Sequence, residues 1–333
     1  MAKQKYIFEF QRAPGDVLML TALVRDLKLT YGDEFAVDVR APYPNLWEHN
    51  PYLDTTPGPA LTLNFDRGHQ AADREAIRAS QRGGGQHYLT AFHRAFTAHT
   101  GIAVEPLFAK PDVHLTAAEK AQPPLAGRYW LIVPGYKIDI TNKAWPVARY
   151  QAVVDCLRAW GLQFVQEGTD KPKHVNPPLT GVLNVVGTTS IRGFMHNLYH
   201  AEGIICGCSL PMHLAAALEK PCVVLLGGRE EPAHEAYVNS FPGSFGPKAA
   251  PVAVPHRVLH TLGQLDCCAT KGCWLRRTEA ISQARQYNTD LCRQPVGRPA
   301  VPHCMHLIEP SHVVEAVMSY YQDGTLPPLP SWA

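Results

Sequence analysis

The hydrophobic pattern of the first forty residues alternates between strand-like and helix-like stretches. Residues 6–10 form an apolar, β-prone run that predicts a strand, and residues 35–39 predict a second strand. Between them lies a stretch, residues 17–30, with apolar side chains close to the 3.6-residue period of a helix, at Val17, Leu20, Leu23, Val24 and Leu27. The order strand, loop, helix, strand is that of a βαβ unit with parallel strands.

A second and longer alternation of the same kind follows residue 126. Its predicted strands are short apolar runs, and the last two of them enclose a helix of small residues. The strands are expected at 129–133, 163–166, 182–186, 203–206 and 222–226, with further helices at 147–160 and 191–200. Strands that alternate with helices predict an α/β fold with parallel sheets, here in two Rossmann-like halves.

Breaks in this pattern divide the chain into four parts. A helix start at 115–120 is followed by a stretch rich in Pro and Gly, 122–127, which is typical of a linker. Two other features are local: the polar, glycine-containing stretch 66–85 predicts a loop, and Ser311 is the expected N-cap of the last helix. The predicted parts are an N-terminal Rossmann-like domain at 1–125, a C-terminal one at 126–265, a Cys-rich segment at 266–309, and a helix and tail at 310–333.

Charge and hydropathy exclude some classes of protein. With 31 Lys and Arg against 29 Asp and Glu, the formal net charge is +2, which gives no electrostatic case for a polyanion as the main partner. No apolar run approaches the roughly 20 residues of a membrane span, and the N-terminus enters a strand pattern without a signal-peptide core. We therefore expect a cytoplasmic protein without a transmembrane segment.

The turn between the strands 203–206 and 222–226 is the strongest candidate for a ligand site. In a βαβ unit, ligands gather at the carboxyl ends of the strands, where backbone N–H groups of the following helix can bind phosphate. The candidate residues of this turn are Cys208, Ser209, Pro211, Met212 and His213.

The loop after the strand at 129–133 has a similar chemistry. Gly135 allows a tight turn beside Tyr136, and two ammonium groups follow on Lys137 and Lys143. Backbone N–H groups and an ammonium at a strand end can hold a diphosphate. The alternative is that both lysines lie on a solvated face.

Three blocks of this sequence resemble the ADP-heptose heptosyltransferases, glycosyltransferase family 9. They are residues 15–28 with Asn50-Pro51-Tyr52-Leu53-Asp54 beyond them, residues 134–146, and residues 207–227. The resemblance implies a GT-B fold, with two facing Rossmann-like domains and the Cys-rich C-terminal segment added. It also implies inverting transfer of a sugar from a nucleoside diphosphate to an acceptor hydroxyl. Heptose is the first choice for the sugar, and ADP is the first choice for the nucleoside diphosphate.

The resemblance assigns roles to particular residues. Asp16 corresponds to the proposed general base, which takes the proton of the acceptor hydroxyl; the alternative is that Asp16 caps the helix that follows. Lys143 corresponds to the lysine on the donor phosphate, and the 207–213 turn, with His213, would stabilise the leaving diphosphate without a catalytic metal or organic cofactor. Thr188 precedes a predicted helix and either reaches the donor or belongs to its cap.

One departure from the family pattern bears on the donor. The family usually has Asp-Ser-Gly-Pro in this turn, whereas the chain has Cys208 and Leu210 at the positions of the acid and the glycine. Arg229 and two carboxylates, Glu230 and Glu231, follow the strand at 222–226, and one of the carboxylates could replace the lost acid. The loss also leaves open a non-catalytic nucleotide-sugar binding protein.

The acceptor is not defined by the sequence. A saccharide, a protein or a nucleic acid, including a modified base, could supply the hydroxyl. His87, Tyr88 and Arg94 follow the 66–85 loop and could stack on or charge-pair with a sugar or a base.

The C-terminal segment concentrates five of the nine cysteines. Cys156, Cys206 and Cys222 sit in apolar patterns and are expected to be small buried residues. By contrast, four cysteines lie among loop residues and could bind one structural Zn or Fe: Cys268, Cys273, Cys292 and Cys304. Some protein heptosyltransferases of the family carry a Cys-bound iron, which the resemblance suggests here; metal-free thiols and disulfides are the alternatives.

Overall fold

The computed structural model describes residues 3–67, 71, 74, 85–241, 243–280 and 290–329. The chain divides into two compact units, each made of several stretches of sequence. The first holds Met1–Gln122, Ala216–Glu219 and Ala233–Pro255, and the second holds Pro123–Ala215, Lys220–Pro232 and His256–Ala333. Most of the predicted loop at 66–85 lies outside the described residues.

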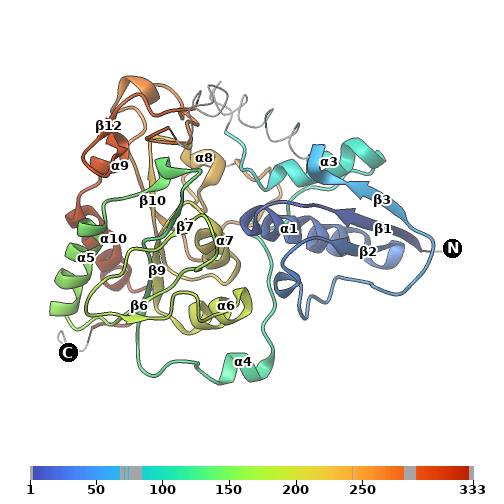
Figure 1. Cartoon of the computed structure of the whole chain (residues 1–333). Coiled ribbons are helices and arrows are strands. Elements are labelled where there is room, and N and C mark those ends of the chain that lie inside the picture. Colours follow the sequence, from blue (N-terminus) through green and yellow to red (C-terminus); the bar gives the residue numbers. More distant parts are fainter. Residues whose placement is uncertain are drawn as a thin grey trace. The chain divides into compact units, whose positions relative to one another are not determined.

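The first unit is built on a parallel sheet of three strands in the order β2-β1-β3 (Figure 1). The helix α1 (Pro14–Tyr31) connects β1 to β2, as the hydrophobic pattern predicts, and every residue from Val17 to Leu27 is buried. The strands are β1 (Gln4–Glu9), β2 (Phe35–Arg40) and β3 (Leu61–Asn64). Because the chain moves from β1 to opposite sides for β2 and β3, a topological switch point lies beside the carboxyl end of β1.

The start of α1 differs from the expectation. The helix begins three residues before Val17, at Pro14, and its N-cap is Ala13, without a side-chain cap. Asp16 therefore lies inside the first turn, where the helix dipole favours a carboxylate, and the alternative that Asp16 caps the helix is wrong. Proline starts the helix earlier because its fixed φ suits the first helical position, where an N–H would have no intrahelical partner.

The other elements of the first unit are short, except for one helix. The helix α3 ends at Gly101, whose φ of 74° is the left-handed conformation that glycine adopts without a Cβ penalty. The helix α4 starts with a capping box between Thr116 and Glu119. The bounds are η1 (Gly32–Glu34), η2 (Pro44–Leu46), α3 (Thr90–Thr100) and α4 (Ala117–Ala121).

A buried charge network joins α1 to α3. The Arg25 guanidinium donates to both carboxylate oxygens of Asp26, at 2.8 and 3.2 Å, and to the Lys110 carbonyl at 3.0 Å. His93 Nε2 lies 2.9 Å from the other side of the same carboxylate, at Oδ2. All three charged or polar side chains are buried. A buried charge is stable only with its partners, so the network commits the two helices to one packing.

Replacement of Asp26 by Asn is expected to lower the free energy of unfolding by about 3–5 kcal/mol, because Arg25 would stay buried without its counter-charge. Urea denaturation of the purified variant measures this. The matched control is Glu219→Gln, which breaks a more exposed ion pair to Lys110 and should cost less than about 1 kcal/mol. Equal urea denaturation midpoints for the two variants would contradict the prediction that Asp26 stabilises the fold more than Glu219 does.

The second unit is built on a parallel sheet of six strands in the order β11-β10-β9-β4-β6-β8. Numbered within the unit, this is the 3-2-1-4-5-6 order of the dinucleotide-binding fold, with its switch point between β4 and β9. The central strands are buried on both faces, as their continuous apolar runs predict. The bounds are β4 (Trp130–Val133), β6 (Phe164–Gln166), β8 (Leu183–Asn184), β9 (Gly203–Gly207), β10 (Cys222–Gly227) and β11 (Arg257–His260).

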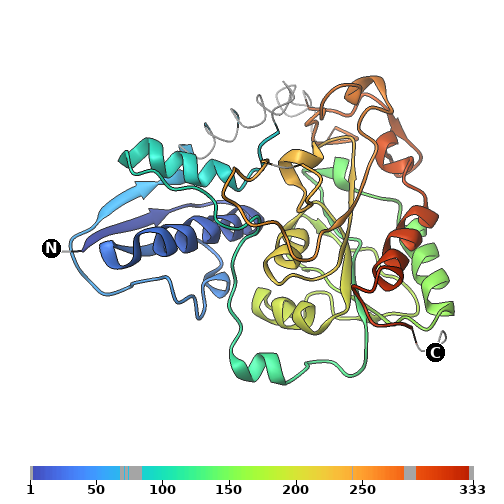
Figure 2. The same cartoon turned by 180° about the vertical axis from the view of Figure 1, so that it is seen from behind.

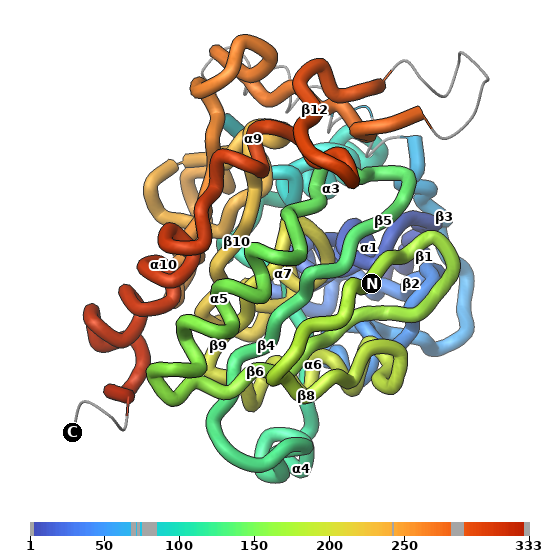
Figure 3. The backbone as a smooth tube through the Cα atoms, turned by 60° about the vertical axis from the view of Figure 1, so that its left-hand side comes forward, coloured from blue at the N-terminus to red at the C-terminus, as the bar shows by residue number. Residues whose placement is uncertain are grey.

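Helices cover both faces of this sheet. On one face α5 and α10 lie side by side, and α6 and α7 lie on the other (Figure 1, Figure 2, Figure 3). The bounds are α5 (Val147–Ala159), α6 (Ile191–His200), α7 (Leu210–Ala217) and α10 (Pro310–Gln322). Two expectations are corrected: Glu309 rather than Ser311 is the N-cap of α10, because its carboxylate forms a capping box with His312, and Cys156 is exposed on α5.

Short elements connect and extend the sheet. After β4 the chain forms β5, which pairs antiparallel with β7, and then a helical turn, η3. In the described part of the Cys-rich segment, residues 266–280 and 290–309, there is little regular structure, as its loop composition predicts. The bounds are β5 (Tyr136–Lys137), η3 (Thr141–Lys143), β7 (His174–Val175), α8 (Pro232–Glu235), η4 (Asp266–Cys268), β12 (Pro295–Val296), β13 (Val301–Pro302) and α9 (His303–His306). Within the described residues, none of the helices combines the length and apolar character that a bilayer crossing requires.

Candidate functional site

Three neighbouring strands of the second unit end at the same edge of the sheet. Because β10, β9 and β4 are adjacent and parallel, the loops that follow Gly227, Gly207 and Val133 leave the sheet together. These loops contain the predicted donor-binding residues, and the switch point between β4 and β9 is where ligands bind in this fold.

Lys143 connects the three loops. It ends η3, and its ammonium donates to the carbonyl oxygen of Cys208 at 2.9 Å and forms an ion pair with Glu230 Oε1 at 2.8 Å. Its side chain is partly exposed, so it keeps access to solvent and to a ligand. The alternative that this lysine lies on a solvated face without a partner is wrong. The structure brings Lys143, Cys208 and Glu230 together from positions that are distant in the sequence.

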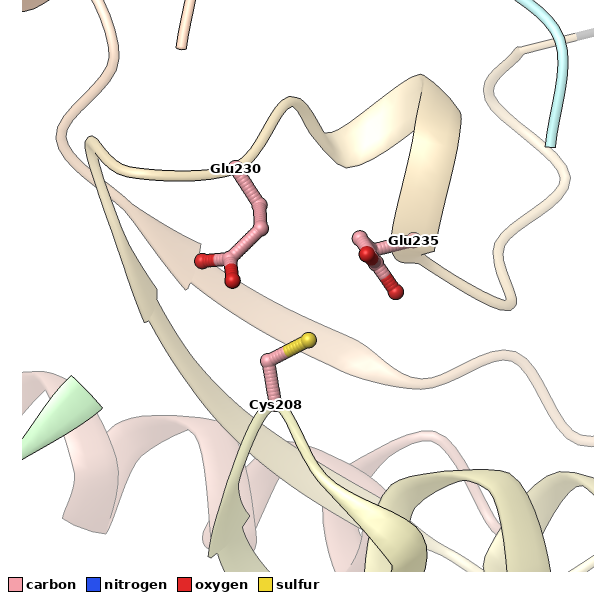
Figure 4. A group of neighbouring side chains, drawn as sticks. All are labelled: Cys208, Glu230 and Glu235. Atoms are coloured by element: carbon pink, nitrogen blue, oxygen red, sulfur yellow. The ribbon is translucent and has the colours of Figure 1, made fainter. Parts of the chain in front are cut away.

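Glu230 is the buried carboxylate of this cluster. Only 1% of the residue is exposed, and its Oε1 accepts from Lys143 and from Arg229. The other oxygen, Oε2, has no hydrogen-bond partner among the described residues. The Cys208 sulfur lies within 4.8 Å of this carboxylate, and Figure 4 draws both side chains; Figure 4 also draws Glu235, which belongs to the first unit. A buried carboxylate with an oxygen unpaired is poised to accept a hydrogen bond from a hydroxyl.

His213 supplies a neutral ring on α7. Burial, and then the nearby charge of Lys143, lower the pKa of His213 to about 3. At neutral pH the imidazole is therefore uncharged, and it can donate or accept a hydrogen bond without adding charge to a diphosphate site.

The predicted turn at 207–213, which includes the start of α7 at Leu210, offers fewer free amides than expected. Pro211 carries no N–H, and the Met212 N–H donates to the Ser209 carbonyl at 3.0 Å. The Met212 side chain is fully buried, so it belongs to the core of the helix. The contribution of this turn to phosphate binding is thereby limited to its remaining backbone and to the Ser209 hydroxyl, which lies 3.4 Å from the Gly207 carbonyl.

The other predicted residues of the second unit lie beside this cluster rather than in it. Tyr136 and Lys137 pair with β7, and a Cβ at Gly135 would collide with the side chain of Asn176, which would have to move. The Thr188 hydroxyl donates to the Val185 carbonyl at 2.8 Å. The cap of α6 is made by the neighbouring Ser190, whose hydroxyl accepts from the Gly193 N–H. The Thr188 hydroxyl is therefore bonded within its own turn and does not cap α6.

In the first unit, Asp16 lies at the switch point. It is partly exposed in the first turn of α1, directly after β1. In the loop after β1, Arg12 donates to Asp66 at 2.9 Å, an ion pair that ties this loop to the chain just beyond β3. Asp16 stays the candidate for the general base, a role that requires hydrogen-bond reach to the acceptor hydroxyl.

The predicted acceptor residues are placed differently from one another. His87 is fully buried: its ring stacks on Phe245 with 4.1 Å between centroids, and its Nδ1 accepts from the Leu89 N–H. The expectation that His87 stacks on an acceptor is therefore corrected, because its ring already packs in the core of the unit. Tyr88 and Arg94 are half-buried and stay candidates.

Sequence reasoning treated Cys273 only as a candidate metal ligand and did not place residues 272–278 against the donor-site loops, where the structure has them. Their backbone contacts Arg229, and the Leu275 carbonyl accepts from Arg229 Nε at 2.7 Å. No hydrophobic period marks this stretch. The one local signal is Gly272, because a glycine directly before a cysteine in an otherwise irregular segment suggests close backbone approach.

Comparisons with known proteins agree with this architecture. The family model for glycosyltransferase family 9 (heptosyltransferase) matches residues 64–241, more than half of the chain. No protein with a curated description matches the sequence.

Several solved structures have a similar fold. The ADP-heptose LPS heptosyltransferase II of E. coli has a TM-score of 0.56 and 15% identity, covering 97% of this chain and 100% of that one. A family 9 glycosyltransferase from Veillonella parvula has a TM-score of 0.56 and 12% identity, covering 96% and 97%. The iron-containing dodecameric glycosyltransferase TibC of enterotoxigenic E. coli has a TM-score of 0.57 and 14% identity, covering 96% and 77%.

The family match identifies the protein as a glycosyltransferase, and the similar structures show the GT-B fold, as the resemblance to the family implies. Within that class, the chain belongs to glycosyltransferase family 9, the heptosyltransferase family.

Proposed function

We propose that this chain is an inverting glycosyltransferase that moves a heptose from an ADP-linked donor to an acceptor hydroxyl. The observation that carries the proposal is the cluster of Lys143, Cys208 and Glu230 at the switch point of a chain of this family. ADP and heptose are supported by similar structures, since TibC has also been solved in complex with ADP-D-β-D-heptose.

In this mechanism Asp16 takes the proton of the acceptor hydroxyl as its oxygen attacks the anomeric carbon. The bond between that carbon and the diphosphate oxygen breaks, and the nucleoside diphosphate leaves with the electron pair. The Lys143 ammonium, together with neutral His213, stabilises the charge that develops on the leaving group. Attack from the face opposite the diphosphate inverts the configuration of the anomeric carbon.

The sugar itself would be oriented by Glu230 and Arg229. The unpaired oxygen of Glu230 can accept from a sugar hydroxyl, which is the task of the acid that Cys208 replaces. The acceptor stays open between a saccharide, a protein and a nucleic acid, with Tyr88 and Arg94 as its candidate contacts.

A panel of ADP-, GDP-, UDP- and CDP-sugars tests the donor by thermal shift. A ligand at a hundred times its Kd that binds only the folded state adds about 2.7 kcal/mol of stability. We expect the largest shift with the ADP-sugar, and a smaller shift with the matched GDP-sugar as the control. A chain that responds to none of the four would contradict the proposed function.

The loss of the acid at Cys208 is the observation that supports the alternative, a nucleotide-sugar binding protein without activity. It predicts the same thermal shift but no release of ADP. Turnover measured as ADP release from the preferred donor separates the two.

We also propose a structural Zn or Fe in the Cys-rich segment. Cys268 and Cys304 both lie against Gly228, where a built Cβ would meet the Cys268 sulfur at 2.7 Å. Burial and, to a smaller extent, the nearby thiols of Cys273, Cys292 and Cys268 raise the pKa of Cys304 to about 12. Four cysteines are a donor set for a structural metal, since four thiolates leave no position for water.

The thiols must approach one another to bind a metal. No three of these four sulfurs, all in the described residues, lie within 4.8 Å of one another, whereas zinc–sulfur bonds of about 2.3 Å hold tetrahedral ligands about 3.8 Å apart. The similar structure TibC is iron-containing, which supports iron as the first choice of metal.

Metal analysis of the purified protein is expected to find about one Zn or Fe per chain. Because a cysteine binds a metal as the thiolate, protons compete with the metal for the sulfur, and the metal should be lost as the pH falls. Cys273→Ser should lose the metal, and Cys156→Ser, an exposed cysteine on α5, should keep it. Purified protein without metal, or full retention in Cys273→Ser, would refute the site.

A further inference from the structure

Residues 272–278, here called the strap, run beside the loop that carries Arg229 and Glu230. The backbone N–H of Trp274 donates to the Arg229 carbonyl at 3.1 Å, and the backbone N–H of Cys273 donates to the Gly228 carbonyl at 3.4 Å. One residue earlier, the Gly272 N–H donates to the Glu231 carboxylate at 3.2 Å. Three consecutive strap residues are thus bonded to this loop.

The strap also fixes the Arg229 guanidinium. Its Nε donates to the Leu275 carbonyl at 2.7 Å, and its central carbon lies 5.7 Å from the Trp274 ring centroid. The same guanidinium pairs with Glu230, whose Oε1 holds Lys143. Trp274 adopts a φ of 55°, a left-handed conformation that persists only where surrounding contacts enforce it. The orientation of the ion-pair chain is therefore set from the strap.

The other end of the strap holds the loop that carries Lys143. The Asn142 N–H donates to the Arg276 carbonyl at 3.1 Å. The Thr278 N–H donates to Thr141 Oγ1 at 2.8 Å, and the two threonine hydroxyls lie 3.0 Å apart. The strap therefore bridges both loops that present charged groups to the candidate donor site.

We propose that the strap positions Lys143 and Arg229 for the donor diphosphate, so that residues 272–278 set donor affinity without touching the donor. This inference rests on the proposed function, because it concerns the same donor site. The strap lies between Cys268 and Cys292, and the Arg277 carbonyl oxygen accepts from the Cys292 N–H at 2.6 Å. Through the strap, the Cys-rich segment therefore contributes to donor binding.

Gly272 is the point at which the strap can be displaced most selectively. A Cβ there would meet the Arg229 carbonyl oxygen at 2.5 Å and the Glu230 carbonyl carbon at 3.2 Å. Both contacts are with backbone, so Gly272→Ala must push the strap and the loop apart. Gly58→Ala is the matched control, since a Cβ at Gly58 meets nothing within 4 Å.

The experiment measures the Kd of ADP by calorimetry and the KM of donor and acceptor for the full-length protein. We expect Gly272→Ala to raise the ADP Kd and the donor KM at least tenfold and to change the acceptor KM less than twofold. Gly58→Ala should match the unmodified protein. A general loss of structure would instead raise both KM values or lower the melting temperature of the protein without ligand.

A second series keeps the test independent of the fold of Gly272→Ala. Thr141→Val removes the hydroxyl that accepts from the strap and should raise the ADP Kd about threefold to tenfold. Thr141→Ser keeps the hydroxyl and should restore the affinity. Unchanged ADP affinity in folded Gly272→Ala or in Thr141→Val would overturn the role of the strap alone, whereas no ADP binding by the unmodified protein would overturn the proposed function as well.

Discussion

The Asp16→Asn variant is expected to lose sugar transfer by a factor of about 10² to 10⁴, the usual contribution of a general base. Asparagine keeps the size and the hydrogen-bonding capacity of the side chain but cannot take the acceptor proton. Since Asp16 belongs to the first unit and the phosphate-binding candidates to the second, ADP affinity should stay within twofold of the unmodified protein. Single-turnover transfer and calorimetric ADP binding give the two values.

Stability is not expected to explain this loss. Asp16 is not the N-cap of α1, so its replacement removes only a favourable dipole interaction of about 0.3–1 kcal/mol. The matched control is Asp33→Asn, in the helical turn that follows α1, with a fully exposed side chain. Transfer at the normal rate by Asp16→Asn would remove the base from the mechanism.

The Lys143→Ala variant is expected to lower kcat by a factor of about 10² to 10³, the loss seen when one group that stabilises developing negative charge is removed. Donor affinity should fall as well, because the ammonium is placed to meet the diphosphate in the ground state. The loss should extend to the buried cluster, since Glu230 would keep only Arg229 as its counter-charge.

Steady-state kinetics with saturating acceptor, together with ADP binding, measures the effect of Lys143→Ala. The exposed Lys120 on α4 supplies the control, and Lys120→Ala should leave both values unchanged. Should Lys143→Ala bind ADP and turn over like the unmodified protein, the phosphate role would have to be reassigned to another cation.

The βαβ unit around residues 203–226 was predictable to within one residue at its strand ends. Its strands are continuous apolar runs bounded by glycine, and such runs have few alternatives in a parallel sheet that is buried on both faces. By comparison, the hydrophobic pattern predicts the start of α1 three residues too late. Pro14 and Gly15 are typical of a loop, although proline also suits the first helical turn.

The candidate site was predictable only in part. Lys143 could be found from its position after a buried strand, but its ion pair with Glu230 joins residues whose proximity follows from strand order. His87 illustrates the opposite error: a histidine beside a tyrosine and near an arginine suggests a binding surface, yet packing against Phe245 removes its ring from solvent. Burial depends on residues far along the chain, and local pattern does not contain it.

The sequence by itself determined the α/β alternation, the family of the chain and the identities of Asp16 and Lys143 as candidates, because period, glycine position and motif order are local properties of the chain. Only the tertiary structure decided that Glu230 is buried against Lys143, that His213 is held neutral, and that residues 272–278 bridge the two loops. The physical reason is that desolvation and pairing of charges arise between elements distant in sequence, and these set the chemistry of the site.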